Sequence, residues 1–175
     1  DLGATPGCQV LVAKDGRVIY DKSFGKHMFG DAKEVENTDL YDLASITKVA
    51  ATTVSLMKLS EQGKLSLDDK MSKYLPDLSG TNKSNVTIRM VLEHKAGLKD
   101  WIPFYYETLN DAHLYDSIFC KVADSLHTVY LGNDLYMTAS YKEHILQRIY
   151  DSELGTVGKY KYSDLGMILM KLLIE

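Results

Sequence analysis

Two short apolar runs near the start of the chain flank a turn. Residues 8–13 and 17–20 are rich in aliphatic residues, and Lys14-Asp15-Gly16 lies between them. An Asp-Gly pair between two such runs is typical of a tight hairpin turn, in which both central residues need a positive φ. The pattern therefore predicts a β-hairpin.

A longer apolar segment, residues 45–62, has helical spacing. Its apolar residues are spread around much of the helix circumference: Ile46, Val49, Ala50, Val54, Leu56, Met57 and Leu59. A helix that is apolar on most sides is typically buried. The segment therefore predicts a buried helix that starts at Ser45 and is ended by Gly63 in the left-handed conformation.

Cap signals predict two further helices. Thr87 or Asn85 can cap a helix over residues 88–94. Ser140 and Glu143 have the capping-box spacing at the start of a helix that runs to about residue 154. The tyrosine-rich stretch between them, residues 100–139, is predicted to be irregular and partly helical. Its aromatic side chains either line a substrate groove or pack under a long connection.

Composition narrows the function classes. The 175 residues are 45% hydrophobic and 25% charged, which fits one globular domain or a large part of one. The net charge of −4 and the lack of a Lys/Arg-rich block argue against nucleic acid and anionic membranes as partners. No apolar run reaches the length of about 18 residues that a membrane span needs. Cys8 and Cys120 have no C-x-x-C spacing, so they are expected to be ordinary thiols, with a single bridge as the alternative.

Cofactor and metal signatures are missing from the sequence. The five histidines show no paired-ligand spacing, and no glycine-rich nucleotide loop is present. We therefore expect neither a metal nor a cofactor. A Ser-His-Asp triad that uses His94 remains an alternative, although the Gly-x-Ser-x-Gly elbow that usually carries one is missing.

Three Ser-x-x-Lys tetrads occur, and one of them lies where a catalytic serine could be activated, at the start of a helix. Ser45 and Lys48 lie at the start of the long apolar helix, where a lysine three residues on shares a face with the serine. Such a pair can act as nucleophile and base. The tetrad at Ser23 contains a glycine, and the tetrad at Ser55 lies in the middle of the helix. The alternative for Ser45 is an ordinary helix start with a surface lysine.

A second element changes this balance. Tyr162-Ser163-Asp164 is the one Tyr-x-Asp triplet in the chain, and an apolar run follows it. Together with the Ser45 tetrad and the segment from His94 to Leu98, it resembles the serine β-lactamase and penicillin-binding-protein superfamily, in particular its class C-like branch. The match runs from about residue 7 to residue 174 and is loosest over residues 100–160.

The resemblance implies a fold and a domain plan. The fold is α/β plus an α-helical lobe, of which this chain would be an N-terminal portion within residues 1–175. Residues 1–44 would belong to the sheet lobe, residues 45–165 would form the helical lobe, and residues 166–175 would begin a helix that returns to the sheet lobe. A bacterial protein of this kind is expected in the periplasm or outside the cell.

The resemblance also implies acyl transfer on a β-lactam or a cell-wall peptide. Ser45 would form the acyl-enzyme, Lys48 and Tyr162 would share the removal of its proton, and residue 164 would contact substrate. Relatives often have asparagine where this chain has Asp164. A carboxylate about 4 Å away attracts an ammonium by about 4 kcal/mol at an effective dielectric of about 20, so Lys48 would stay charged and Tyr162 would be the base. Ser45, Lys48 and Tyr162 are therefore expected to converge in space.

The family's third element is missing from the sequence. It is a Lys-Thr-Gly-like or His-x-Gly-like strand that supplies the second oxyanion donor, and no such triplet occurs in the chain. Losing one oxyanion donor costs about a hundredfold to a thousandfold in turnover. The isolated chain is therefore expected to be weakly active or inactive as a serine hydrolase. The alternative is a catalytically inactive accessory or binding domain in a larger cell-wall protein.

The hairpin generates the first testable prediction. In the fold of the superfamily that this chain resembles, other strands of the sheet come from sequence after residue 175. The hairpin would therefore present an open apolar edge, and such edges tend to pair with other strands. We expect the chain to self-associate through this edge or to be marginally stable. Light scattering combined with denaturant titration checks this, and a monodisperse, highly stable monomer would contradict it.

Overall fold

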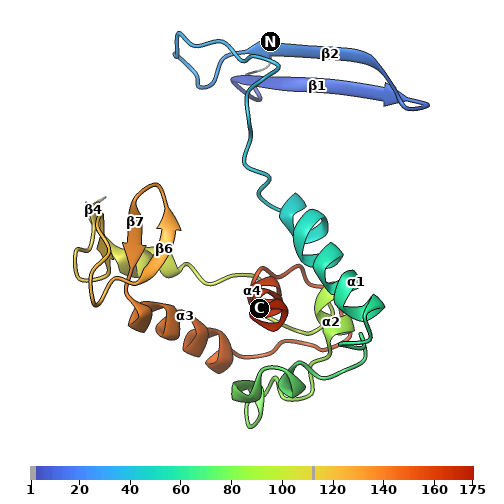
Figure 1. Cartoon of the computed structure of the whole chain (residues 1–175), viewed down its shortest axis with the longest axis vertical. Helices are drawn as coiled ribbons and strands as arrows, with labels where there is room; N and C mark the ends of the chain where they lie inside the picture. The colour runs from blue at the N-terminus through green and yellow to red at the C-terminus, as the bar shows by residue number, and fades with distance from the viewer. Residues whose placement is uncertain (1–2, 112) are drawn as a thin grey trace. The chain divides into compact units, whose positions relative to one another are not determined.

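The computed structural model describes residues 3–111 and 113–175 and divides the chain into two compact units (Figure 1). The first unit is Asp1–Ala44 and the second is Ser45–Glu175. None of the helices in the described residues combines the length and apolar character needed to cross a membrane. Both cysteines are free thiols and half-buried, so they form no bridge.

The first unit is built on the predicted hairpin. Strands β1 (Gly7–Lys14) and β2 (Arg17–Gly25) pair antiparallel, with Lys14 opposite Arg17. Asp15 and Gly16 both have positive φ, 51° and 74°, as a two-residue turn of the primed type requires. The sequence prediction of a hairpin is confirmed.

Many apolar side chains of this hairpin are exposed. The exposed fraction is 60% for Leu11 and 64% for Ile19. In the segment that follows, Val35 is buried, and the side chain of Gln9 donates a hydrogen bond to the carbonyl of Asp39 at 3.0 Å. The hairpin is thus bonded to the segment that follows it in the chain, while many of its apolar side chains remain exposed.

The predicted helix after Ser45 is present. It comprises a π-helical segment, η1 (Lys48–Thr53), and α1 (Val54–Glu61). Gly63 ends it with φ 67°, as expected. The prediction that this helix is buried is wrong for the described residues, because only Leu56 is buried and Met57 is 65% exposed.

The core of the second unit forms around α2 (Ile88–Leu92) and α4 (Leu165–Ile174), and α4 contacts α1, α2 and η1 (Figure 1). Thr87, one of the two predicted caps, accepts a hydrogen bond from the Met90 N–H at 3.2 Å, and α2 ends at Leu92 and not at residue 94. Gly166 allows the close approach of α4 and α2, since a Cβ there would lie 2.5 Å from Cγ1 of Val91. Fully buried members of this core include Met71, Leu78, Ile88, Ile149, Leu169 and Met170.

Three corrections concern residues 100–154. In the part that the structure describes, residues 100–138 contain one 3₁₀ segment, η4 (Phe104–Thr108), and also five short strands, which the sequence does not predict. They are β3 (Leu109–Asn110), β4 (His113–Leu114), β5 (Phe119–Cys120), β6 (Val129–Gly132) and β7 (Leu135–Met137), and the last three form a sheet in the order β5-β7-β6.

Helix α3 (Ala139–Asp151) differs from the prediction at both ends. It is capped by Thr138 and not by Ser140, because the Thr138 hydroxyl accepts a hydrogen bond from the Tyr141 N–H. It ends at Asp151, before the predicted residue 154.

A fully buried lysine joins α3 to an earlier turn. The Lys83 side chain has no exposed surface, and its ammonium donates to the carbonyl of Tyr150 at 2.9 Å, to the carbonyl of Ser152 and to Oδ1 of Asn82 at 2.8 Å. A cation at a helix C-terminus satisfies carbonyls that have no partner within the helix. Lys83 therefore closes the end of α3.

Replacing this lysine tests its structural role. We expect Lys83→Met to lower the free energy of unfolding by about 3 kcal/mol, because it leaves buried carbonyl oxygens without a donor. Denaturant titration followed by far-ultraviolet circular dichroism measures the change. The matched control is Lys70→Met, since Lys70 is exposed and its side chain bonds only Asn85 in the described residues, and it should cost less than about 0.5 kcal/mol. Equal effects of the two variants would contradict the role assigned to Lys83.

Candidate active site

Ser45 stands at the entrance of the helix that carries Lys48. The residue before it, Ala44, has the unusual φ of 46°, and the Lys48 N–H donates to the Ser45 carbonyl at 3.1 Å to form the first turn. The π-helical segment that starts at Lys48 has a wider turn than an α-helix, and the hydroxyl of Thr53 donates to the Lys48 carbonyl at 2.8 Å. Short π segments are rare in proteins, and those that occur are often found at functional sites.

The Lys48 ammonium reaches two acceptors. It donates to Ser45 Oγ at 3.2 Å, and it lies 2.7 Å from Oδ1 of Asp164. The Lys48 side chain is only 16% exposed, whereas the Asp164 side chain is 51% exposed. The lysine therefore links the serine hydroxyl to a carboxylate at the start of α4.

Tyr162 completes the group from a distant part of the sequence. Its hydroxyl is 2.9 Å from Ser45 Oγ, although the two residues are 117 positions apart. Lys48 Nζ lies 4.9 Å from the centre of the Tyr162 ring. The predicted convergence of Ser45, Lys48 and Tyr162 is thus confirmed as geometry, while their catalytic roles stay a prediction.

Backbone pairing holds the segment that carries Tyr162. Residues 155–164 lie against residues 94–100, which follow α2 directly. The connecting hydrogen bonds run from Gly155 N to Gly97 O at 2.7 Å, Gly158 N to Lys95 O at 2.8 Å, Lys161 N to His94 O at 2.7 Å and Asp164 N to Asp100 O at 2.8 Å. The buried Ser163 adds a hydroxyl bond to the Lys99 carbonyl at 2.6 Å. This pairing brings Tyr162 and Asp164 to the serine.

The neighbours of Lys48 and Tyr162 shift their pKa values in opposite directions. Burial of the Lys48 amine, the largest single influence, lowers its pKa, but the contacts with Asp164 and Tyr162 together outweigh burial and raise it above the ordinary value. Lys48 and the Ser45 hydroxyl favour the phenolate form, so the pKa of Tyr162 lies below its ordinary value. A charged lysine and a more acidic tyrosine therefore face the same serine hydroxyl.

Comparison with known families decides the assignment. A family model described as Beta-lactamase matches residues 1–175. The chain belongs to the beta-lactamase family. It is 31% identical over 183 residues to N-acetylmuramyl-L-alanine amidase of Bacillus subtilis (strain 168), and the match covers 97% of this chain and 36% of that protein. The chain thus spans about a third of the length of this curated relative.

Solved structures show the same fold. The octameric penicillin-binding protein homologue from Pyrococcus abyssi superposes with a TM-score of 0.67 at 24% identity, covering 98% of this chain and 35% of that one. A class C beta lactamase superposes with a TM-score of 0.64 at 21% identity, covering 97% of this chain and 38% of that one. The predicted β-lactamase/transpeptidase fold, present as part of the full fold, is therefore confirmed.

The other two serine tetrads of this beta-lactamase family member do not form a serine–lysine pair in the described residues. Ser23 Oγ bonds the side chain of Asn37. Lys58, the lysine of the Ser55 tetrad, pairs with Glu61 at 2.7 Å. Of the three tetrads, Ser45–Lys48 alone has the hydrogen bond that activation needs.

His94 takes a different place from the one that a Ser-His-Asp triad requires. Among the described residues, the partners of Ser45 Oγ are Tyr162 and Lys48, and His94 Nδ1 instead accepts from the Ser163 N–H at 3.2 Å. The alternative of a triad with His94 is therefore not supported. No motif in the sequence indicates that this histidine contacts residues 155–164, here called the tyrosine segment.

One group in the described residues gathers ligand types that a metal accepts. Cys120, Asp124 and His127 place one potential ligand atom each within 4.8 Å of one another. The Asp124 carboxylate, however, already accepts from His127 Nδ1 at 2.9 Å and from the His127 N–H at 2.7 Å. These bonds hold a local turn, and we assign the group no functional role.

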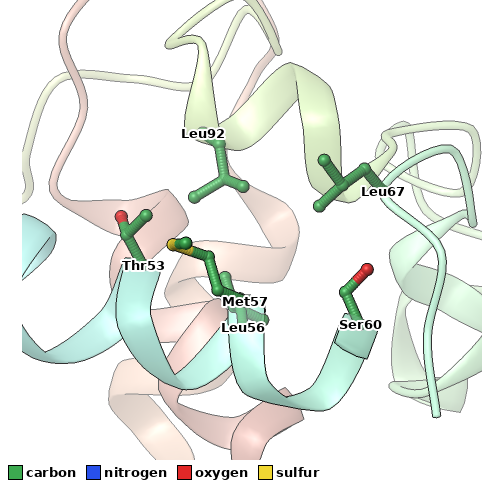
Figure 2. A pocket seen from close by; sticks show the side chains of 6 residues that line it. All are labelled: Thr53, Leu56, Met57, Ser60, Leu67 and Leu92. Carbon is green, nitrogen blue, oxygen red and sulfur yellow. The ribbon is translucent and has the colours of Figure 1, made fainter. Parts of the chain in front are cut away.

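An apolar pocket lies beside η1 and α1, the helix that follows Ser45 and is here called the serine helix, but away from Ser45 itself. It has a volume of about 310 Å³, and Figure 2 shows Leu92 from α2 pointing toward Met57 on α1, with Leu67 at the other end. None of Ser45, Lys48, Tyr162 and Asp164 lines it. The candidate active site at Ser45 and this pocket are therefore separate sites, although both involve the helix that follows Ser45.

The Lys48–Asp164 pair generates a prediction. In Asp164→Asn we expect the pKa of Lys48 to fall, because burial is then opposed only by Tyr162. Since the pKa of Lys48 is raised in the folded state, the pair stabilises the fold at pH values below the ordinary lysine pKa of about 10.5 and stops doing so as the pH rises through the folded value. Nuclear magnetic resonance of lysine ¹³Cε measures the shift directly.

The control for this experiment removes a carboxylate from a different lysine. Glu61→Gln breaks the exposed pair with Lys58 and should leave the Lys48 signal unchanged. A Lys48 pKa that is the same in Asp164→Asn and in the wild type would show that Asp164 does not keep this amine charged.

Proposed function

We propose that this chain carries the acylating residues of a serine hydrolase that acts through a Ser45 acyl-enzyme. The observation that carries the proposal is the pair of hydrogen bonds at Ser45 Oγ, one with the Lys48 ammonium at 3.2 Å and one with the Tyr162 hydroxyl at 2.9 Å. An activated serine needs a base within hydrogen-bond reach, and this hydroxyl has two polar neighbours at such distances.

The roles of the two neighbours follow from their charges. Lys48 stays protonated beside Asp164 and can only donate to Ser45 Oγ. The serine proton is therefore directed to the Tyr162 oxygen, and the lowered pKa of Tyr162 makes its phenolate more accessible. Tyr162 acts as the base and Lys48 stabilises the phenolate by its charge.

The reaction proceeds in two steps. Ser45 Oγ bonds to the carbonyl carbon of an amide, lactam or ester while its proton moves to Tyr162, and the carbonyl oxygen becomes an oxyanion that can accept from the Ser45 N–H. Collapse of this intermediate breaks the bond to the leaving group, which takes the proton from Tyr162. Water then attacks the ester carbonyl and gives one proton to Tyr162. Collapse of this second intermediate breaks the bond to Ser45 Oγ, which takes that proton back from Tyr162, and the acid leaves with the other proton of the water.

The substrate class is proposed from the relatives. One relative is named as an amidase, and the structural neighbours include a penicillin-binding protein homologue and a class C beta lactamase. These names favour a β-lactam or a cell-wall peptide as substrate, with Asp164 at the substrate side of the site. They also favour the periplasm or the cell exterior of a bacterium as the location.

A second candidate is a catalytically inactive accessory or binding domain of a larger cell-wall protein. The observation that favours it is Asp164, because a carboxylate paired with Lys48 offers no side-chain N–H to a substrate carbonyl. The division into residues 1–44, 45–165 and 166–175 and self-association through the hairpin edge are part of either proposal. Both proposals concern this chain, which spans about a third of its curated relative.

Covalent labelling separates the two candidates. A fluorophosphonate probe requires only an activated serine, and a fluorescent penicillin also requires the substrate class. We expect both probes to label Ser45, the penicillin slowly, and Ser45→Ala to abolish labelling. Tyr162→Phe should slow the fluorophosphonate reaction by about a hundredfold to ten-thousandfold, the range that a general base contributes.

The matched control is Ser55→Ala, which disrupts a second Ser-x-x-Lys tetrad in the same helix and should label at the wild-type rate. No labelling of the folded wild type by either probe would refute the hydrolase and support the binding domain. Labelling by the fluorophosphonate alone would keep the nucleophile and reject the β-lactam.

A further inference from the structure

His94 occupies a backbone position that ordinarily belongs to glycine. Helix α2 ends with the two hydrogen bonds of a Schellman motif, from Lys95 N to Met90 O at 2.7 Å and from His94 N to Val91 O at 3.0 Å. The residue at the turn of this motif must be left-handed, and His94 has φ 55°. Glycine adopts this conformation without strain, so the helix end gives no reason for a histidine.

The side chain supplies that reason. His94 Nδ1 accepts a hydrogen bond from the Ser163 N–H at 3.2 Å, next to Tyr162 in the sequence. The imidazole ring lies 4.6 Å from the Tyr162 ring at an angle of 34°, and Tyr160 meets it edge-on at 5.9 Å. The His94 carbonyl accepts from the Lys161 N–H at 2.7 Å. One residue thus contacts the tyrosine segment through its backbone, its ring nitrogen and its ring face.

We propose that His94 is a positioning residue that, as neutral imidazole with its proton on Nε2, holds the Tyr162 hydroxyl against Ser45. It does so by accepting the Ser163 N–H and by packing against the phenol ring. The inference rests on the proposed function in one respect, because it assumes that the Tyr162 phenol acts on Ser45. His94 itself does not touch Ser45 Oγ.

The neutral form is required because only an unprotonated Nδ1 can accept a hydrogen bond. Among the described residues, the charges that act on the ring are those of Lys48, from the helix after Ser45, and of Asp164, from the tyrosine segment. Its sequence neighbours Glu93 and Lys95 pair with each other at 2.8 Å. Burial and then the charge of Lys48 lower the pKa of His94, against the opposing effect of Asp164. The anchor is therefore intact at neutral pH and is lost as the pH falls below the ordinary histidine value of about 6.5.

Two substitutions separate the ring nitrogen from the backbone. His94→Gly keeps the left-handed turn, and even favours it, but removes the acceptor. His94→Asn places an amide oxygen near the position of Nδ1, and asparagine tolerates the same φ. Neither glycine nor asparagine titrates near neutral pH. The control is His144→Asn, since His144 is exposed and pairs with Glu107 on a different part of the unit.

The readout is the pKa of the Tyr162 phenol, measured from ¹³Cζ-tyrosine resonances, with Tyr162→Phe to assign the signal. In the wild type we expect a value below the ordinary value of about 10. His94→Gly should return it to about 10, and His94→Asn and His144→Asn should keep it low. In the wild type the Tyr162 signal should also respond to acid below about pH 6.5, and His94→Asn should lose this response. Fluorophosphonate labelling of Ser45 should slow by on the order of a hundredfold in His94→Gly.

The outcomes distinguish this inference from the proposed function. A wild-type Tyr162 pKa near 10 would refute the base role of Tyr162, and the positioning role with it. A low wild-type pKa that stays low in His94→Gly would overturn the role of His94 alone. If His94→Asn behaves like His94→Gly, the hydrogen bond to Ser163 is not the anchor and the proposal is wrong. Circular dichroism at each pH shows whether the variants are folded.

Discussion

The pairing of residues 94–100 with residues 155–164 is the constraint on which the candidate site depends. Ser45 and Lys48 share one helix and need only local structure to meet. Tyr162 and Asp164 reach them only because their backbone is bonded to the turn after α2, through contacts such as Lys161 N to His94 O at 2.7 Å. Helix α4 then fixes the other end of the segment, since Gly166 lets it pack closely on α2. A long-range site is thus built by one short backbone interface.

The ion pair between Lys48 and Asp164 favours the charged form of the lysine. A lysine in a Ser-x-x-Lys tetrad can be a base only if it loses its proton, and burial alone would favour that loss. Asp164 opposes it at 2.7 Å. Charge on the lysine in turn favours the phenolate of Tyr162. In the proposed mechanism, the Asp164 carboxylate therefore assigns the role of proton acceptor to the Tyr162 phenol and not to the Lys48 amine.

Local signals in the sequence were sufficient for the hairpin turn at Asp15-Gly16, the Ser45 helix and the cap at Thr87, because each depends on a few adjacent residues. The strands of residues 109–137 are two to four residues long, and so short a pattern carries little periodicity. A lysine such as Lys83 is ordinarily expected at the surface. Its burial depends on hydrogen bonds to carbonyls nearly 70 positions away in the sequence. The contact between His94 and Tyr162 arises from tertiary pairing, so no local pattern in the sequence predicts it.

The two units of the chain are joined just before Ser45, and this has a consequence for dissecting the protein. Leu40 is 98% exposed and Leu43 is 54% exposed, which makes this connection accessible to a protease. Every hydrogen bond among Ser45, Lys48, Tyr162 and Asp164 joins residues of the second unit. A cut at this connection would therefore remove the hairpin and leave the nucleophile, its lysine and its tyrosine on one polypeptide with their mutual contacts unbroken.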